Sequence, residues 1–366
     1  MKILFYNDYR FRQGGAETYW RDTASALTAA GLDVRRLSFE TRIEDRLSGR
    51  EALTTFLSEK HALTLLDETI HTYCPDIIHL NNYVKYTAVI GEILRRRPIP
   101  AVTTVHDYYA VPFPVSFKNR LKALFRPCLK HCSHYIIPSR HYYTELNKRK
   151  VTGVRHIPHF IRLEKWPYHC NYDNNRTELL FVGRLERIKG AHILLSAVKL
   201  LSDRFPELRL TVVGEGREVP RLQKTIDATG LSEKVRLIGA VEQDRVADYY
   251  RKSSIVVMPS IADEILGLVG PEAMASGIPV VASDVAGIRE WCIHGKTGLL
   301  TAPGDAAALT RTLQHLLENP PLRQRLREQA RAFVEQRFSE QNTIGNLIGY
   351  YRQILQHAER GPLGEV

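Results

Sequence analysis

The chain is poor in cysteine and has no long hydrophobic run, and both shortages limit what it can be. Its 366 residues include five cysteines, an odd number, and their spacing matches no disulfide framework. Reduced thiols, and therefore a cytoplasmic location, are expected. No apolar stretch approaches the roughly 18 residues that a membrane-spanning helix needs, and the apolar start is too short for a signal peptide. We expect a protein that is free in the cytoplasm or peripheral on the inner face of the membrane.

Several familiar catalytic motifs are also missing. No G-x-G-x-x-G fingerprint follows the first expected strand, which argues against a standard dinucleotide fold. The turn Val213–Gly216 has no Lys and no following Ser or Thr, so it is not an ATPase phosphate loop. A G-x-S-x-G nucleophile elbow is absent. Cys128, His131, Cys132 and His134 lack a second spaced ligand pair, so no metal is expected.

What is present is an ordinary globular composition with a basic excess. Hydrophobic residues make up 44% and charged residues 25%, which excludes general disorder. The net charge of +11 arises almost entirely in residues 1–170, which indicates either an anionic partner or a solubilising surface. Segment Phe117–Cys132 sets basic side chains beside an apolar stripe, so it fits a helix on an anionic membrane or one packed on the sheet. No nucleic-acid-binding module is recognised, so no nucleic acid partner is expected.

Short apolar runs alternate with helical patterns along the chain. In the first half, strands are expected over 2–6, 34–39, 76–80, 101–106 and 134–138, and helices over 16–30, 50–73, 88–97, 118–132 and 141–148. After a polar stretch at 166–177, strands are expected over 178–183, 209–214, 235–238, 255–259 and 279–283, and helices over 190–205, 219–229, 245–252, 270–276, 306–319, 321–337 and 341–357. This rhythm predicts parallel sheets with helices on both faces, in two domains over 1–165 and 177–340. Ligands of such sheets bind beyond the carboxyl ends of the strands.

Two turns between a strand and a helix have residues suited to phosphate. In Gly14-Gly15-Ala16-Glu17, glycine allows a ligand to approach closely and the helix start offers free amides to anions, although strand-to-helix turns use glycine anyway. In segment 183–190, Arg184 and Lys189 can converge on a diphosphate, through charge-assisted bonds worth about 1.5–3 kcal/mol each. Arg187 of the same turn is expected to face solvent.

Segment 259–281 has the strongest pattern. Glu264 and Glu272 lie near each other in sequence, but Gly267 and Gly270-Pro271 interrupt a continuous helix. We expect a loop with Glu264 and then a helix that starts near Pro271. Amides at that helix start can receive a phosphate, while the two carboxylates accept hydrogen bonds from hydroxyls. Together these groups describe a sugar-nucleotide site.

The ordered set GGAE, GR-x4-KG, VGEG and PS-x3-E-x7-E-A-M-A-S-G-x-P-V-V resembles the family 4 retaining glycosyltransferases of the GT-B fold. The resemblance runs over nearly the whole chain, in the family's order and spacing. It implies two Rossmann-like domains with parallel sheets facing a central cleft, and a C-terminal helix (341–366) that returns to the first domain. It also implies transfer of a sugar from a UDP- or GDP-linked donor to a hydroxyl of a glycan or lipid-linked acceptor. A role in bacterial polysaccharide or glycolipid assembly, without a metal cofactor, is expected.

The same resemblance assigns roles to single residues. Arg184 and Lys189 would hold the donor diphosphate, Glu264 would contact hydroxyls of the donor sugar, and Glu272 would contact the nucleotide ribose. His106 resembles a residue that contacts the donor sugar near its reacting carbon, although a lone histidine at a strand end is more often structural. His106, Glu264, Arg184 and Lys189 form the expected catalytic set.

Backbone positions complete the expected donor site. These are Gly15, Gly214 and the amides of Gly267, Leu268 and Val269. The sequence departs from the family at Leu266, where an aromatic residue is usual, and at Gly270-Pro271, so the shape of this loop is open.

Two other classes of function stay open. One is a different enzyme on the same fold, such as a sugar-nucleotide epimerase or a phosphorylase. The other is a non-catalytic protein that binds sugar nucleotides. A glycosidase that uses Glu264 and Glu272 as its acid–base pair is disfavoured, because hydrolysis needs no phosphate clamp.

Overall fold

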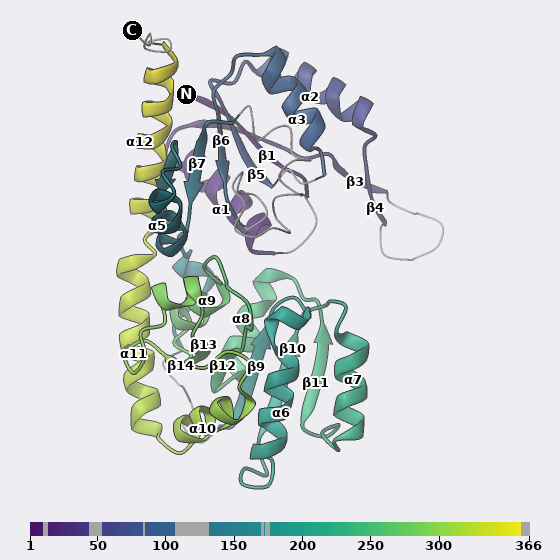
Figure 1. Ribbon diagram of the computed structural model, residues 1–366, viewed down its shortest axis with the longest axis vertical. Coiled ribbons are helices and arrows are strands. Elements are labelled where there is room, and N and C mark those ends of the chain that lie inside the picture. The colour runs from purple at the N-terminus through teal and green to yellow at the C-terminus, as the bar shows by residue number, and fades with distance from the viewer. Residues whose placement is uncertain are drawn as a thin grey trace. The chain divides into compact units, whose positions relative to one another are not determined.

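The computed structural model describes residues 1–9, 14–43, 53–82, 85–106, 132–169, 172 and 176–359. The chain forms two compact units, Met1–His159 with the C-terminal segment from Glu340, and Phe160–Ser339 (Figure 1). In its described residues, each unit contains a six-stranded parallel sheet, which confirms the two predicted α/β sheets. The expected basic helix over 118–132 lies outside the described residues, except for Cys132. No helix of the described part of the chain is long and apolar enough to span a membrane.

In the first unit, the strands lie in the order β2-β1-β5-β6-β7-β8. The strands are β1 Lys2–Asn7, β2 Asp33–Leu37, β5 Ile77–Asn82, β6 Ala101–Thr104, β7 His134–Ile137 and β8 Val154–His156, and the helices are α1 Gly15–Ala29, α2 Glu59–Tyr73, α3 Thr87–Arg96, α5 Arg140–Lys148 and α12 Glu340–Glu359. Because the chain first moves outward from β1 to β2 and then resumes on the other side at β5, the order of strands reverses between β1 and β5.

In the second unit, the order is β11-β10-β9-β12-β13-β14. The strands are β9 Glu178–Val182, β10 Arg209–Val213, β11 Val235–Gly239, β12 Ile255–Met258, β13 Val280–Ser283 and β14 Leu299–Thr301. The α-helices are α6 Ala191–Leu201, α7 Val219–Ala228, α8 Gln243–Lys252, α9 Val269–Ala275, α10 Ala306–Leu317 and α11 Pro320–Arg337, and the 3₁₀ turns are η2 Leu163–Lys165, η3 Arg187–Lys189 and η4 Ala286–Glu290. Here the reversal falls between β9 and β12.

Strand β9 shows why this second sheet is covered on both faces. Leu179 and Phe181 belong to one buried cluster with side chains of α6 and α10. Leu180, between them, belongs to another buried cluster with side chains of α8, α9 and α11. Successive strand residues point to opposite faces, so an unbroken apolar run fits a strand that is buried on both sides.

The helix predicted over 50–73 is wrong in its first part. Residues 53–56 form strand β4 (Leu53–Phe56) instead, which pairs antiparallel with strand β3 (Glu40–Ile43) in a separate two-stranded sheet. The Leu-Thr-Thr-Phe sequence is typical of a strand, and pairing with β3 favours the strand over the predicted helix. Helix α2 begins only at Glu59, where the Ser58 side chain accepts a hydrogen bond from the backbone of His61 at 3.4 Å.

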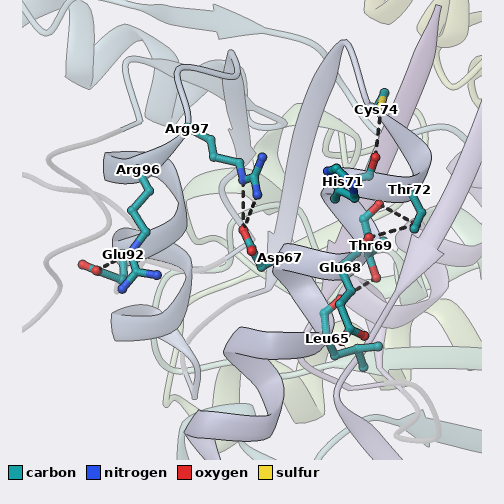
Figure 2. Close-up of polar contacts among 10 residues, drawn as sticks. All are labelled: Leu65, Asp67, Glu68, Thr69, His71, Thr72, Cys74, Glu92, Arg96 and Arg97. Atoms are coloured by element: carbon teal, nitrogen blue, oxygen red, sulfur yellow. Dashed lines mark hydrogen bonds and ion pairs between the residues drawn. The ribbon is translucent and has the colours of Figure 1, made fainter.

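Helices α2 and α3 are joined at their surface by an ion pair (Figure 2). Both Nε and Nη2 of Arg97 donate to Oδ1 of Asp67, at 2.9 and 2.8 Å. Arg95 and Arg96 contact Glu92 within α3. Three of the arginines of this unit are therefore paired with carboxylates on their own surface.

The second unit begins before the polar stretch 166–177. Trp166 is 3% exposed, and its ring meets that of Tyr250 edge-on, with centroids 5.5 Å apart. Burial against α8 places Trp166 in the core of the second unit. The short strands β8 and β14 were not predicted from the sequence, because three-residue strands leave too little pattern to read.

Candidate functional site

The reversal of strand order between β9 and β12 places two of the predicted motifs side by side. In open parallel sheets, the crevice beyond the carboxyl ends of the strands at such a point is where ligands bind. The turn after β9 holds residues 183–190, and the turn after β12 holds residues 259–268. The backbone amide of Ile261 donates to the carbonyl of Ile188 at 2.8 Å, which joins the two turns.

Lys189 and Glu264 meet at this point. Lys189 Nζ donates to both carboxylate oxygens of Glu264, at 2.6 and 2.8 Å. Ser260 Oγ donates to Oε1 of the same carboxylate at 2.7 Å. The side chains are 23% and 12% exposed, so the pair is mostly enclosed but still reaches solvent. An ammonium has three donors, so Lys189 can hold Glu264 and still donate to another anion.

Glycines allow the strand-end turns to pack against one another. Gly190 has a φ of 74°, and a Cβ built on it would lie 1.8 Å from the carbonyl oxygen of Pro259. Gly214 has a φ of 140°, and its Cβ would lie 1.9 Å from the carbonyl oxygen of Gly183. Only glycine fits at these contacts. Gly214 therefore has a structural task in the turn, besides the ligand contact predicted for it.

The loop that holds Glu264 is fixed at two of its carbonyls. Gly287 N donates to Glu264 O at 3.0 Å, and Trp291 Nε1 donates to Leu266 O at 2.6 Å. A Cβ on Gly270 would lie 2.1 Å from the Trp291 ring, so α9 requires glycine there. Leu266 is 4% exposed and lies in the core. The departure from the family pattern at Gly270 is thus explained by packing against Trp291, whereas nothing in the structure explains the leucine at 266.

Helix α9 starts at Val269, with Pro271 in its first turn as predicted. The backbone amides of Gly267, Leu268 and Val269 donate to no acceptor within the described ranges. Consecutive unpaired amides at the start of a helix attract an anion, since they present partial positive charge.

Glu272 lies in the first turn of α9 and is 9% exposed. The hydroxyl of Tyr250 lies 3.2 Å from Glu272 Oε2 and 3.3 Å from the carbonyl of Val269, and it can donate to either. Burial and the nearby Glu272 carboxylate raise the pKa of Tyr250 well above its ordinary value, so the hydroxyl keeps its proton. Sequence reasoning missed Tyr250, because nothing in the local pattern of α8 points to a residue of another helix.

Arg184 is not brought into the ion pair. Its side chain is exposed and has no hydrogen-bond or ion-pair partner in the part of the chain that the structure describes. The neighbouring Leu185 is 1% exposed and points into the core instead. Arg187 is also exposed, as predicted.

In the first unit, Gly15 begins α1 after β1, and His106 follows β6. His106 Nε2 lies 2.6 Å from Asn81 Oδ1. The His106 ring centroid lies 5.1 Å from that of Tyr19 and 5.1 Å from that of His159. Burial lowers the pKa of His106 to about 3, so the imidazole is neutral near pH 7. Asn81, Tyr19 and His159 were not predicted as site residues, since each is distant from His106 in the sequence and lies beside it only in the folded unit.

Two family profiles match consecutive parts of the chain. The profile described as Glycosyltransferase Family 4 matches residues 13–165, and the one described as Glycosyl transferases group 1 matches residues 165–333.

Curated relatives and solved structures agree with these profiles. The D-inositol 3-phosphate glycosyltransferase of Corynebacterium urealyticum is 35% identical over 50% of this chain and 44% of its own length. The glycogen synthase of Mycobacterium tuberculosis is 26% identical over 80% of this chain and 72% of its own length. For the first curated relatives, the match spans less than half of their length, between 35% and 44%.

Among solved structures, the sucrose-phosphate synthase of Thermosynechococcus elongatus has a TM-score of 0.81 and 25% identity, and covers 97% of this chain and 99% of its own. Anabaena HepE in complex with UDP and glucose has a TM-score of 0.77 at 22% identity, over 96% of this chain and 100% of its own.

Proposed function

We propose that this chain, which belongs to the family 4 glycosyltransferases of the GT-B fold, moves a sugar from a nucleoside-diphosphate donor to an acceptor hydroxyl with retention of configuration. The observation that supports this most is that three groups lie on the turns after β9 and β12, where the strand order reverses. They are the Lys189 ammonium, the Glu264 carboxylate, and the unpaired amides of residues 267–269. A cation and free amides suit a diphosphate, and a carboxylate suits sugar hydroxyls.

In the proposed reaction, the bond between the sugar carbon and the diphosphate breaks while the acceptor oxygen bonds to that carbon on the same face. The departing phosphate oxygen takes the acceptor proton. Lys189, Arg184 and the amides of residues 267–269 stabilise the negative charge that develops on the leaving group, which is electrostatic catalysis. These two cations and the amide donors support a reaction without a metal ion.

Glu264 and Glu272 would act as hydroxyl acceptors rather than as an acid–base pair. Glu264 already accepts from Lys189 and Ser260, which fixes its carboxylate against the turn. Glu272 is fixed through Tyr250 and would accept from the ribose. The contact predicted between Gly15 and the donor phosphates stays a prediction, because Gly15 and Lys189 belong to different units.

The acceptor is proposed to be a glycan or a lipid-linked acceptor in bacterial polysaccharide or glycolipid assembly. The relatives named above include a D-inositol 3-phosphate glycosyltransferase and a glycogen synthase, whose names refer to a polyol phosphate and to a glycan. The basic excess in residues 1–170 supports an anionic membrane surface on the cytoplasmic side as a second partner.

A thermal-shift screen with UDP, GDP, ADP and their sugars tests the donor class. A ligand that binds only the folded state, at about 100 times its Kd, adds about 2.7 kcal/mol to the free energy of unfolding. We expect one base to stabilise the protein and inorganic phosphate at equal concentration to leave it unchanged. Stabilisation by none of the nucleotides would remove the basis of the proposal. Incubation with the donor alone separates an epimerase, which isomerises the sugar without an acceptor.

The role of Glu272 predicts a binding defect in Tyr250→Phe. This change removes the hydroxyl from beside the carboxylate, and hydrogen bonds to charged groups contribute about 1.5–3 kcal/mol. We expect the Kd of the nucleotide, measured by calorimetry, to rise about tenfold, with kcat little changed. Tyr249→Phe is the matched control, because the adjacent Tyr249 hydroxyl has no hydrogen-bond partner among the residues described. Equal affinities of the two variants would contradict the role of Tyr250.

A further inference from the structure

Asn81 connects three elements of the first unit at the carboxyl end of its sheet. It is 3% exposed and lies in β5. Its amide nitrogen donates to Asn7 Oδ1 at 2.9 Å and to the carbonyl of Ala16 at 2.8 Å. Its amide oxygen lies 2.6 Å from His106 Nε2. The end of β1, the start of α1 and the end of β6 therefore meet at one side chain.

The orientation of this amide is determined by backbone carbonyls. The carbonyl of Ala16 can only accept a hydrogen bond, so the Asn81 atom that faces it must be the nitrogen. At the far end, Asn7 Nδ2 donates to the carbonyl of Tyr9, so the Asn7 oxygen must face Asn81. Both hydrogens of the Asn81 amide are then used, and its oxygen must face His106.

The orientation of Asn81 in turn fixes the hydrogen on His106. An amide oxygen can only accept, so at 2.6 Å His106 Nε2 must carry the hydrogen and donate it. Because burial keeps the ring neutral, Nδ1 then carries a lone pair and can accept a hydrogen bond. Nδ1 has no hydrogen-bond partner in the described residues, and Tyr19 and His159 contact the ring without donating to it.

We propose that Asn81 is a positioning residue that holds His106 in the Nε2–H tautomer, so that Nδ1 accepts a hydrogen bond from a hydroxyl of the donor sugar. The contact between Nδ1 and the donor sugar rests on the proposed function, whereas the assignment of the tautomer does not. The proposal also gives a substrate class. A sugar with a hydroxyl opposite Nδ1 is preferred over its deoxy or carbonyl analogue, because a carbonyl would meet a lone pair. The same side chain ties His106 to Ala16, next to Gly15, so one residue couples the two predicted motifs of this unit.

Nitrogen-15 NMR of histidine-labelled protein tests the tautomer directly. Long-range proton–nitrogen correlations distinguish an Nε2–H ring from an Nδ1–H ring, and the His106→Gln variant assigns the signal among the 14 histidines. We expect wild-type His106 to be Nε2–H. An Nδ1–H pattern for His106 in otherwise wild-type protein, or a protonated His106 ring at pH 7, would overturn the proposal before any change at Asn81 is made.

Asn81→Leu, of similar size, removes the acceptor. We expect the His106 signal to change to a mixture of tautomers. His79 serves as an internal control, because its ring nitrogens contact Tyr351 and Thr104 rather than Asn81. An unchanged His106 tautomer in folded Asn81→Leu would overturn the proposal.

Steady-state kinetics then distinguish a positioning role of Asn81 from a general loss of structure. We expect kcat of Asn81→Leu to fall about 30-fold with the donor KM within threefold, and Asn81→Leu combined with His106→Ala to be no slower than His106→Ala alone. Additive losses would overturn the coupling. If wild-type protein shows the Nε2–H tautomer but transfers no sugar from any donor, the proposed function fails while the tautomer assignment stands.

Discussion

Lys189→Met is expected to lower kcat/KM for the donor by about 1,000-fold, which corresponds to about 4 kcal/mol of lost transition-state stabilisation. Methionine keeps most of the length of the side chain and removes its charge. The leaving diphosphate loses a cation, and the Glu264 carboxylate, 12% exposed, loses the partner that lies 2.6 Å away. Steady-state kinetics against a range of donor concentrations measures the loss.

Arg187→Met is the matched control for charge. Arg187 is in the same turn and has the same sign of charge, but it is exposed to solvent. We expect its kcat/KM to stay within about threefold of wild type, since exposed charges contribute little. Lys189→Met also leaves the Glu264 carboxylate without its cation, which is expected to lower thermal stability. The double variant Lys189→Met with Glu264→Gln removes that charge, so we expect it to regain thermal stability but not activity. Full activity of Lys189→Met would exclude Lys189 from the site.

Gly190→Ala is expected to lower the free energy of unfolding by about 3 kcal/mol or more. The added Cβ would lie 1.8 Å from the carbonyl oxygen of Pro259, at a φ of 74°. A backbone carbonyl cannot rotate away as the end of a flexible side chain can, so the turns after β9 and β12 must separate. Urea denaturation followed by circular dichroism measures the change.

Gly230→Ala isolates the backbone contribution. Gly230 has a φ of 70°, nearly that of Gly190, but a Cβ there would have nothing within 4 Å. It should cost only about 1 kcal/mol, the strain of a left-handed alanine. If both variants lost the same free energy of unfolding, the turns after β9 and β12 would have to separate without an energetic cost, which would contradict the prediction. A further consequence is that Gly190→Ala should also weaken donor binding, because Pro259 precedes Ser260 in the loop that holds Glu264.

Much of the site could be predicted because its motifs are local. Arg184, Lys189 and Glu272 follow strands whose apolar runs are evident, and the carboxyl ends of parallel strands share one edge. The pairing of Lys189 with Glu264 could not be predicted, because the two residues are 75 positions apart and meet only through the order of β9 and β12. Likewise, the glycine at 270 had no local explanation, since the ring it accommodates belongs to Trp291.

The sequence by itself determined the α/β class, most strand positions, the family resemblance and the residues at the strand ends, because apolar runs, turn residues and short motifs are properties of neighbouring positions. The tertiary structure decided how those residues are paired. Lys189 with Glu264, Tyr250 with Glu272, and Asn81 with His106 each join separate elements. Hydrogen bonds form between groups a few ångströms apart, and strand order and loop packing set which groups come that close.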